Sequence, residues 1–269
     1  MKISGLLLCL ALLSPAARAA DAGAPPAAPA PSNTTTGTFW GQAAWIITTP
    51  GGTVLAVDPW LDNPLAPKIE KPDKPAKLDA ILITHGHADH VGNAVELAKK
   101  TGAKIIAPYE LTMLLGVPDA IGAGLGGTVI IKDATIHFVE AAHSSGFVSE
   151  KEKAAGPKYG GAPVGYVIEV PKGPTIYHAG DTDVFAGMSL IAERYHPTVG
   201  LLPIGGHFTM DPTGAALATK LLKLKTVVPM HYSTFPVLKG SPDELRAALK
   251  KEKSSAKVVE VKPGDTVKL

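Results

Sequence analysis

Short apolar runs recur along most of the chain, separated by turns or by stretches with helical spacing. Runs rich in Val, Ile and Leu are typical of buried strands. They cover residues 43–48, 53–58, 78–84, 104–108, 135–141, 165–170, 175–179, 199–204 and 226–230. Residues 91–102 instead carry apolar side chains at helical spacing and end at a glycine. Strands with helices between them predict an α/β fold.

Two later helices have explicit start signals. Asp211 followed by Pro212 places a cap residue before a proline at the first helical position, and Ser241 with Glu244 forms a capping-box pattern. Both arrangements suit the unpaired backbone N–H groups at a helix start. The letters PGG at 50–52 separate the first two apolar runs and predict a hairpin turn.

Residues 1–19 differ from the rest of the chain. Lys2 provides a positive start, residues 5–13 are apolar, and Ala17 and Ala19 flank a small-x-small cleavage site. The apolar stretch is shorter than the roughly 20 residues that span a bilayer, which favours a signal peptide over a membrane anchor. We therefore expect export to the periplasm or the exterior, with no stable membrane insertion after cleavage.

Residues 20–36 are rich in Ala and Pro and then in Thr, with almost no large apolar side chain. This composition predicts a disordered linker. We therefore expect a signal peptide at 1–19, a linker at 20–36 and a folded domain at 37–269.

The cysteine and charge content exclude several classes of protein. The single cysteine, Cys9, lies in the predicted signal peptide, so the mature chain would have no disulfide, cysteine nucleophile or thiolate metal ligand. Cleavage would also remove Lys2 and Arg18, leaving 24 basic and 24 acidic residues. A mature net charge near zero disfavours nucleic acid as a partner.

Directly after the run 78–84, the letters HGHADH place His85, His87, Asp89 and His90 together. Side chains two apart in an extended chain share a side, so the first two histidines can bind one metal ion. A turn then lets the aspartate and the third histidine reach a second ion, because zinc accepts imidazole nitrogen and carboxylate oxygen. The alternative is that Asp89 caps a helix starting near Val91 while the histidines line a polar turn.

Three further candidate ligands follow apolar runs: His143, Asp181 and His231. Each alone is a weak signal, because one buried imidazole is easily satisfied by hydrogen bonds. Together with the first four residues they would complete two metal sites built from nitrogen and oxygen.

These motifs, in this order and approximate spacing, resemble the metallo-β-lactamase superfamily from about Phe39 to Leu269. The finer strings resemble an uncharacterised metal-dependent hydrolase branch that is also similar to ascorbate-6-phosphate lactonase. They are HSSGF, YGGAPVGYVIE, YHAGDTDVF, PIGGHFTM and VVPMHYSTFP. The resemblance implies a single-domain, four-layer αββα sandwich with the site where strand ends meet.

The resemblance also assigns the ligands. His85, His87 and His143 would bind the first metal; Asp89, His90 and His231 the second; and Asp181 would bridge both. One departure is Gln42, in Gly-Gln-Ala, where relatives often have Gly-His-Ala. This difference bears on the surroundings of the metals and on the choice of substrate.

The expected activity is hydrolysis of an ester-like bond, a lactone or a phosphodiester, in a small-molecule substrate. Two divalent ions can share a water and lower its pKa so that hydroxide attacks near neutral pH. Zinc is the leading candidate, and Mn, Fe or Ni also suit these ligands. Asp89 would orient the hydroxide and relay its proton.

Three alternatives stay open on this scaffold. β-Lactam hydrolysis is less favoured, because zinc β-lactamases often have a cysteine where this chain has Asp181. A metal-binding or sensing protein without catalysis is a second alternative. Oxygen or nitric-oxide reduction at a di-iron centre is a third.

Two features near the predicted ligands have proposed roles. His207, after Gly205 and Gly206, would donate a hydrogen bond to the substrate or its oxyanion, and its removal would cost about 10²–10³ in rate. Residues 144–163 would form a mobile flap, with Lys158 and Tyr159 contacting an anionic substrate, or else an ordinary surface loop.

Overall fold

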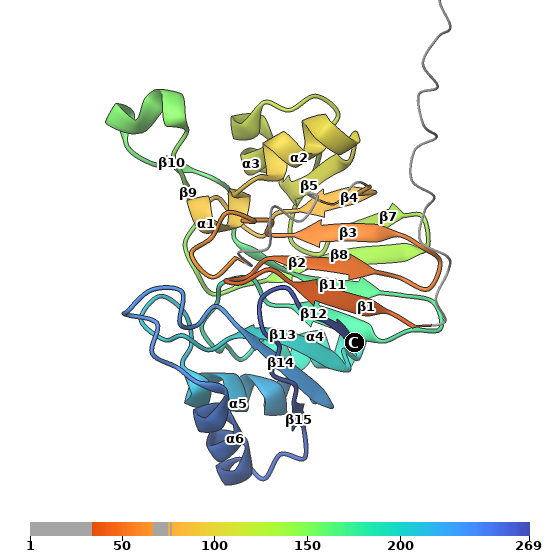
Figure 1. Ribbon diagram of the computed structural model, residues 1–269, viewed down its shortest axis with the longest axis vertical. Coiled ribbons are helices and arrows are strands. Elements are labelled where there is room, and N and C mark those ends of the chain that lie inside the picture. Colours follow the sequence, from red (N-terminus) through yellow and green to blue (C-terminus); the bar gives the residue numbers. More distant parts are fainter. Residues whose placement is uncertain (1–33, 67–74, 76) are drawn as a thin grey trace, which may run out of the picture.

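The structure is a computed structural model that describes residues 34–66, 75 and 77–269 (Figure 1). The predicted signal peptide 1–19, and the predicted linker up to residue 33, lie outside this part. The first strand begins at Thr36, the last residue of the segment predicted as linker. Within the described residues, none of the helices has the length and apolar character needed to cross a membrane.

Two seven-stranded sheets form the centre of the molecule. The first has the order β16-β1-β2-β3-β4-β5-β6, and β3, β4, β5 and β6 in it run parallel. Its strands are β1 (Thr36–Phe39), β2 (Trp45–Thr48), β3 (Val54–Val57), β4 (Ala80–Leu82), β5 (Lys104–Pro108), β6 (Ile121–Ala123) and β16 (Thr266–Lys268).

The second sheet has the order β15-β14-β13-β12-β11-β8-β7, with β12, β13, β14 and β15 parallel. Its strands are β7 (Thr128–Ile131), β8 (Ala134–Glu140), β11 (Val164–Glu169), β12 (Thr175–His178), β13 (Val199–Pro203), β14 (Thr226–Met230) and β15 (Lys257–Val258).

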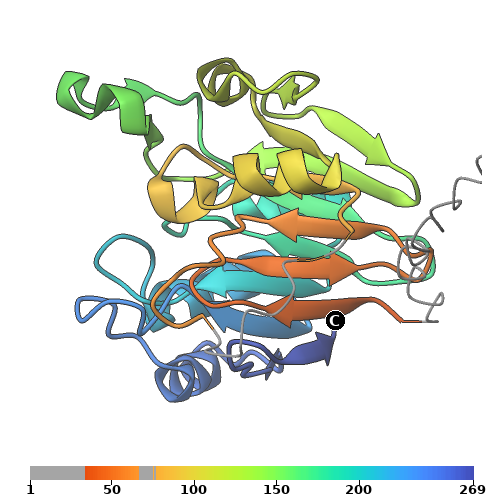
Figure 2. The same cartoon turned by 45° about the horizontal axis from the view of Figure 1, so that its top comes forward.

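Helices cover the outer face of each sheet, as Figures 1 and 2 show. They are α1 (Ala88–Val91), α2 (Ala94–Thr101), α3 (Tyr109–Leu115), α4 (Met188–Tyr195), α5 (Pro212–Leu221) and α6 (Pro242–Lys251). Trp45 and Phe138 belong to the core between the sheets. Leu97 packs in the core under the first three helices, and Leu245 in the core under the last three. The chain is thus the predicted four-layer αββα sandwich.

The predicted helix starts at α5 and α6 are confirmed. Asp211 accepts a hydrogen bond from the backbone N–H of Gly214 at 2.8 Å. The Ser241 hydroxyl accepts from the Glu244 N–H while the Glu244 carboxylate accepts from the Ser241 N–H, so the capping box is complete.

The helix predicted over 91–102 is interrupted. Gly92 separates α1 from α2 with a φ of 41°, and a Cβ there would lie 2.5 Å from the Trp60 Cα. Only glycine fits this close approach. The first helix begins at Ala88, so the alternative in which Asp89 caps a helix near Val91 is wrong.

Strand direction brings the candidate residues together. β8 and β12 both run antiparallel to β11, so they end at the same edge of the second sheet. The parallel strands β13 and β14 end there too. The segments that leave these ends, and those that follow β3 and β4, meet along one edge of the sandwich, where ligands bind in open α/β sheets.

A small hairpin projects beside this edge. It consists of β9 (Gly146–Phe147), the 3₁₀ helix η1 (Glu150–Ala155) and β10 (Lys158–Tyr159). Figure 1 shows it standing apart from the helical layer near α1 and α3. The segment predicted as a flap, 144–163, therefore has a defined structure of its own, which we call the flap hairpin.

Candidate metal centre

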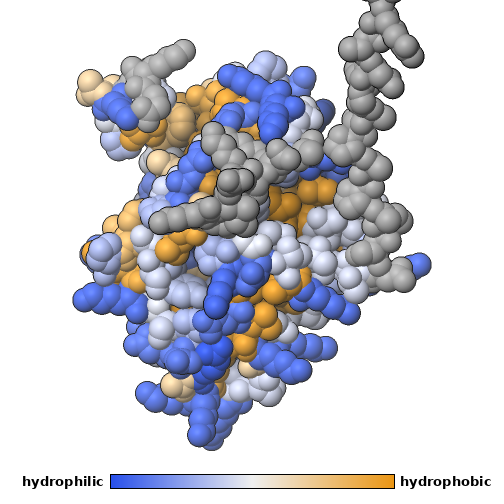
Figure 3. All heavy atoms as spheres, viewed as in Figure 1, coloured by the Kyte–Doolittle hydropathy of each residue, from blue (hydrophilic) through white to orange (hydrophobic). Residues whose placement is uncertain are grey.

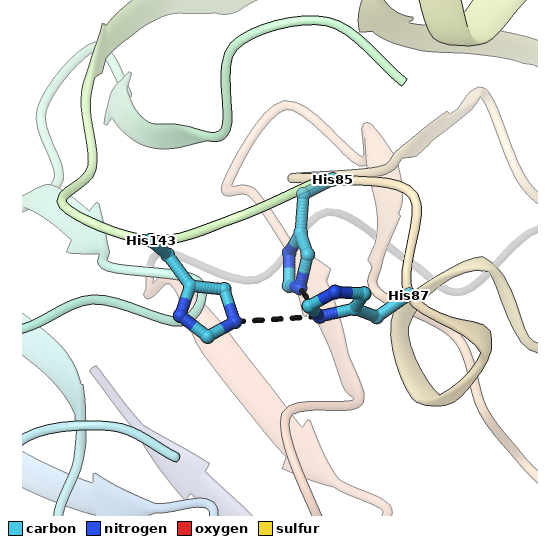
Figure 4. Close-up of side chains that lie close together, drawn as sticks. All are labelled: His85, His87 and His143. Atoms are coloured by element: carbon cyan, nitrogen blue, oxygen red, sulfur yellow. Dashed lines mark hydrogen bonds between the residues drawn. The ribbon is translucent and has the colours of Figure 1, made fainter. Parts of the chain in front are cut away.

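Three imidazoles gather in a first cluster, made of His85, His87 and His143 (Figure 4). The Nε2 atom of His85 lies 2.9 Å from the Nδ1 atom of His87, and the Nε2 atom of His143 lies 3.3 Å from the same Nδ1. The first two side chains leave the end of β4 on one side, as the sequence predicted. The third comes from the second sheet, after β8.

A second cluster adjoins the first and consists of Asp89, His90, Asp181 and His231. The Nε2 atom of His90 lies 3.5 Å from Asp89 Oδ2 and 3.3 Å from Asp181 Oδ1. The Nε2 atom of His231 lies 3.5 Å from Asp89 Oδ2 and 3.1 Å from Asp181 Oδ2. The structure thus brings all seven predicted ligand residues together.

Asp181 joins the two clusters. Besides its contacts in the second cluster, its Oδ2 atom lies 3.6 Å from Nε2 of His143 in the first. Its carboxylate is buried, at 4% side-chain exposure. This is the position that a bridging ligand requires.

The spacing of the donor atoms is close to that of ligands around a metal ion. Zinc ligands at 2.0–2.1 Å from the ion lie about 3.3 Å apart at tetrahedral angles, which matches the spacings in both clusters. His90 Nε2 and Asp181 Oδ1 are buried, and although they lie 3.3 Å apart, neither has a hydrogen bond of good geometry within the described residues. Buried polar atoms are rarely left unpaired without a reason, and a bound cation supplies one.

The protonation states of the first cluster suit metal binding. Burial lowers the pKa of His85 well below its ordinary value, and the neighbouring His90 lowers it further. Burial also lowers the pKa values of His87 and His143. A neutral imidazole has one ring nitrogen with a free lone pair, as a metal site needs, and the ligand atoms of this cluster lie within 4.8 Å of one another.

The second cluster holds its charges differently. Burial opposes charge on His90, but Asp181, Asp89 and Asp58 outweigh it and raise its pKa well above the ordinary value. For His231, burial is likewise outweighed by Asp181, and the pKa rises to about 9. The pKa values of both cluster carboxylates are lowered, despite burial, chiefly by His90. A divalent cation would replace the imidazole protons as the partner of these carboxylates.

Asp58, which the sequence analysis did not single out, orients the second cluster. It is fully buried after β3, and its Oδ2 atom lies 2.8 Å from Nδ1 of His90. The same carboxylate accepts hydrogen bonds from the backbone N–H and the hydroxyl of Thr84. Accepting the Nδ1 proton leaves Nε2 of His90 free for a ligand, a common arrangement around metal-binding histidines.

Asp58→Asn is expected to weaken metal binding at the second cluster, which contains His90, by about 10–100-fold. The amide keeps the shape of the side chain but does not balance the charge on His90. Competition titration with a chromogenic chelator measures the change. Asp79→Asn is the control, because the Asp79 carboxylate binds Lys132 and lies outside both clusters. Equal metal affinities in the two variants would show that Asp58 does not support metal binding.

Gln42 is a second residue whose contacts the sequence did not predict. Its side chain is buried, and its Nε2 atom donates to Asp89 Oδ2 at 2.8 Å and lies 2.7 Å from His231 Nε2. Its backbone carbonyl accepts from the His231 N–H at 2.7 Å. Gln42 therefore holds residues of both sheets in place.

Three site residues have left-handed backbone: Gln42 with a φ of 51°, Asp58 with 45° and His231 with 55°. This conformation is uncommon for residues other than glycine and costs free energy. The hydrogen bonds described above stabilise this conformation, in which the three side chains contact residues of the second cluster.

A cavity of about 450 Å³ opens over both clusters. His87, Asp89 and Asp181 form part of its floor, and Trp60, Phe208 and Phe235 give it aromatic walls. Such a cavity can hold a small molecule against the ligand residues.

His207 lies elsewhere. It is exposed, its ring packs against Phe208 at 4.5 Å between centroids, and it does not line the cavity. The backbone approach that the two glycines suggested occurs at Gly205, where a Cβ would lie 2.2 Å from the His231 carbonyl oxygen. The hydrogen bond from His207 to a substrate stays a prediction that this geometry does not favour.

The flap residues Lys158 and Tyr159 are exposed and do not line the cavity either.

His178 is buried beneath the site, where its Nε2 atom lies 3.0 Å from the Ala43 carbonyl oxygen and its Nδ1 accepts from the Gly180 N–H. Burial lowers the pKa of His178, so a neutral imidazole ties β12 to the turn before β2.

Known proteins are similar to this chain in sequence. The family described as "Beta-lactamase superfamily domain" matches residues 37–231. A "UPF0173 metal-dependent hydrolase" of Myxococcus xanthus is 58% identical over 234 residues, which are 86% of this chain and 82% of that protein. A protein of the same name from Anaeromyxobacter sp. (strain K) is 50% identical over 240 residues, covering 86% of this chain and 85% of its own.

Solved structures share the fold. Igni18, described as a novel metallo hydrolase from the hyperthermophilic archaeon Ignicoccus hospitalis, is 39% identical with a TM-score of 0.76. The match covers 88% of this chain and 98% of that one. An isothiocyanate hydrolase from Delia radicum gut bacteria, at 18% identity, TM-score 0.63 and 87% and 98% coverage, is similar in fold alone. The chain therefore belongs to the β-lactamase superfamily and, within it, to the metal-dependent hydrolases named UPF0173.

Proposed function

We propose that the protein hydrolyses an ester-like bond of a small molecule with two divalent metal ions, zinc foremost. The observation that carries this proposal is the pair of adjoining donor clusters under one cavity. His85, His87 and His143 would hold the first ion; Asp89, His90 and His231 the second; and Asp181 would contact both. Bound ions would supply a water that ionises near neutral pH and positive charge for a developing oxyanion.

Asp89 is the residue best placed to move a proton. Its side chain is 26% exposed, against 4% for Asp181, and it lines the cavity. Its lowered pKa keeps it ionised, and the hydrogen bond from Gln42 fixes one carboxylate oxygen. An ionised Asp89 would therefore orient the attacking water by accepting a hydrogen bond from it, and would relay its proton because bound ions lower the pKa of that water.

The cavity supports catalysis over a purely structural metal site. Structural zinc sites are closed by four protein ligands, whereas catalytic sites keep a position open to water or substrate. Here His87, Asp89 and His143 all border open space. The aromatic walls exclude water from a bound substrate, which strengthens electrostatic interactions at the reacting bond.

The proposal is tested with protein freed of metal by a chelator and then reloaded with zinc or manganese. The substrates are 4-nitrophenyl acetate, a γ-lactone, bis(4-nitrophenyl) phosphate and a β-lactam. We expect turnover of the ester or the lactone only after reloading. Turnover of the β-lactam alone would support the β-lactamase alternative, and no turnover of any of the four would support a metal-binding protein without catalysis.

We also propose that the protein is exported and works in the periplasm or outside the cell. The proposal rests on the charged start, apolar stretch and small-x-small site within residues 1–19. Sequencing the N-terminus of protein from the native host is expected to give a chain that begins near Ala20. Met1 retained on cytosolic protein would contradict export.

A further inference from the structure

We propose that the substrate carries an apolar acyl or aryl group, and that this group lies in a groove between the flap hairpin and the helices α1, α2 and α3. The inference rests on the proposed hydrolysis of an ester-like bond and names the class of substrate. It favours carboxylic esters and lactones over phosphodiesters.

The groove has a volume of about 750 Å³, within the range of small-molecule sites. Phe147 and Val148 of the flap hairpin form one wall. Val95, Leu114 and Leu115, from α2 and α3, form the facing wall. In Figure 3, apolar surface is visible between the projecting hairpin and the helical layer.

The groove adjoins the cavity over the two clusters. Trp60 and Ala88 line both spaces, and Gly86, between the ligands His85 and His87, lines the groove. A Cβ at Gly86 would lie 3.1 Å from the Cβ of Phe147, so the glycine lets the hairpin approach the ligand segment. A substrate whose reacting bond lies over the clusters can therefore extend past Trp60 into the groove.

The side chains that line the groove favour an uncharged group in it, whereas over the clusters bound ions would supply positive charge to the reacting bond. Among the described residues that line them, the charged side chains are carboxylates and histidines, without a lysine or arginine. Asp62, at the groove, would repel an anionic group, whereas phosphate recognition usually employs Arg or Lys. Phe208, which is 54% exposed, and Phe235 offer further apolar contact at the cavity mouth.

The test is a series of 4-nitrophenyl esters from acetate to decanoate, assayed with metal-loaded protein. Each methylene that enters the groove is expected to raise kcat/KM by up to about fourfold. Val148→Asp, in the exposed wall of the groove, should lower the ratio of the decanoate rate to the acetate rate at least about tenfold. Val237→Asp is a matched control, because Val148 and Val237 are 42% and 43% exposed and only the former lines the groove.

A second pair tests the facing wall. Leu115 lines the groove and is changed to Asp. The control is Met113→Asp, because Met113 lies on the same helix, is 67% exposed and does not line the groove. We expect the first substitution to reduce the dependence on chain length and the second to leave it unchanged. If Leu115→Asp fails to fold, Val148→Asp alone decides the matter.

The outcomes separate this inference from the proposed function. Acetate turnover with no dependence on chain length, or a dependence that Val148→Asp does not reduce, would overturn the apolar groove and leave the hydrolase intact. No turnover of any ester in this series, together with none of the four substrates above, would refute the proposed function instead. In that case the apolar groove is tested by the binding of 4-nitrophenyl decanoate, measured by tryptophan fluorescence. Weaker binding to Val148→Asp than to Val237→Asp protein supports the groove, and equal binding overturns it.

Discussion

Asp181→Asn protein is expected to hold at most one metal ion per chain and to lose more than about 10³-fold in turnover, because metal ions supply several kcal/mol of transition-state stabilisation. The side chain contacts histidines of both clusters. The amide removes the negative charge that holds two cations close together. It is nearly the same size as the carboxylate, so the effect reports on charge and coordination.

The measurement combines elemental analysis after saturation and dialysis with kinetics on the best ester found. Asp183→Asn is the matched control, since Asp183 is exposed two residues away and accepts a hydrogen bond from the Val184 N–H. The control should retain the wild-type metal content and rate. Full metal content and activity in Asp181→Asn would contradict the bridging role.

Asp89→Asn protein, saturated with metal, is expected to lose about 10²–10⁴ in kcat while keeping the fold, the range that a general base contributes. An amide at this position neither accepts a proton nor balances the charge of the second ion. Only its one carbonyl oxygen could replace the oxygen that now accepts from Gln42.

The assay must be made on protein whose metal content has been measured, so that a lost ion is not mistaken for a lost base. Asp119→Asn provides a control at an exposed position with a φ of 59°, which asparagine tolerates. A metal-replete Asp89→Asn protein with the wild-type rate would show that Asp89 takes no part in proton transfer.

The central strands were predictable because they are buried on both faces. The apolar runs 104–108 and 226–230 coincide with β5 and β14, whose neighbours on each side are other strands. The edge strand β7, Thr128–Ile131, was not predicted, because its apolar run is only three residues long and every second residue of the strand is exposed. The helices α3 and α4 also went unpredicted, because both are short and have weak start signals.

The candidate ligands were predictable because the first four are local in sequence and the others follow strong strand signals. Asp58 was not predicted, although it too ends an apolar strand, because one aspartate before a proline is typical of an ordinary turn. Its partner His90 lies 32 positions away, and only the fold joins them.

Gln42 and His207 show a second reason why part of the site could not be predicted from the sequence. The contacts of Gln42 with Asp89 and His231 cross between the two sheets, so no local pattern reveals them. For His207, the strand end and the two glycines pointed to the site. Phe208 lines the cavity and His207 does not, although both side chains are exposed, because local conformation decides which of two adjacent side chains reaches the cavity.

Metal stoichiometry tests the central claim most directly. Protein saturated with zinc, dialysed free of excess and analysed by inductively coupled plasma mass spectrometry should contain about two ions per chain, as two adjoining donor clusters require. One ion or fewer per chain under saturating zinc would contradict the two-metal centre.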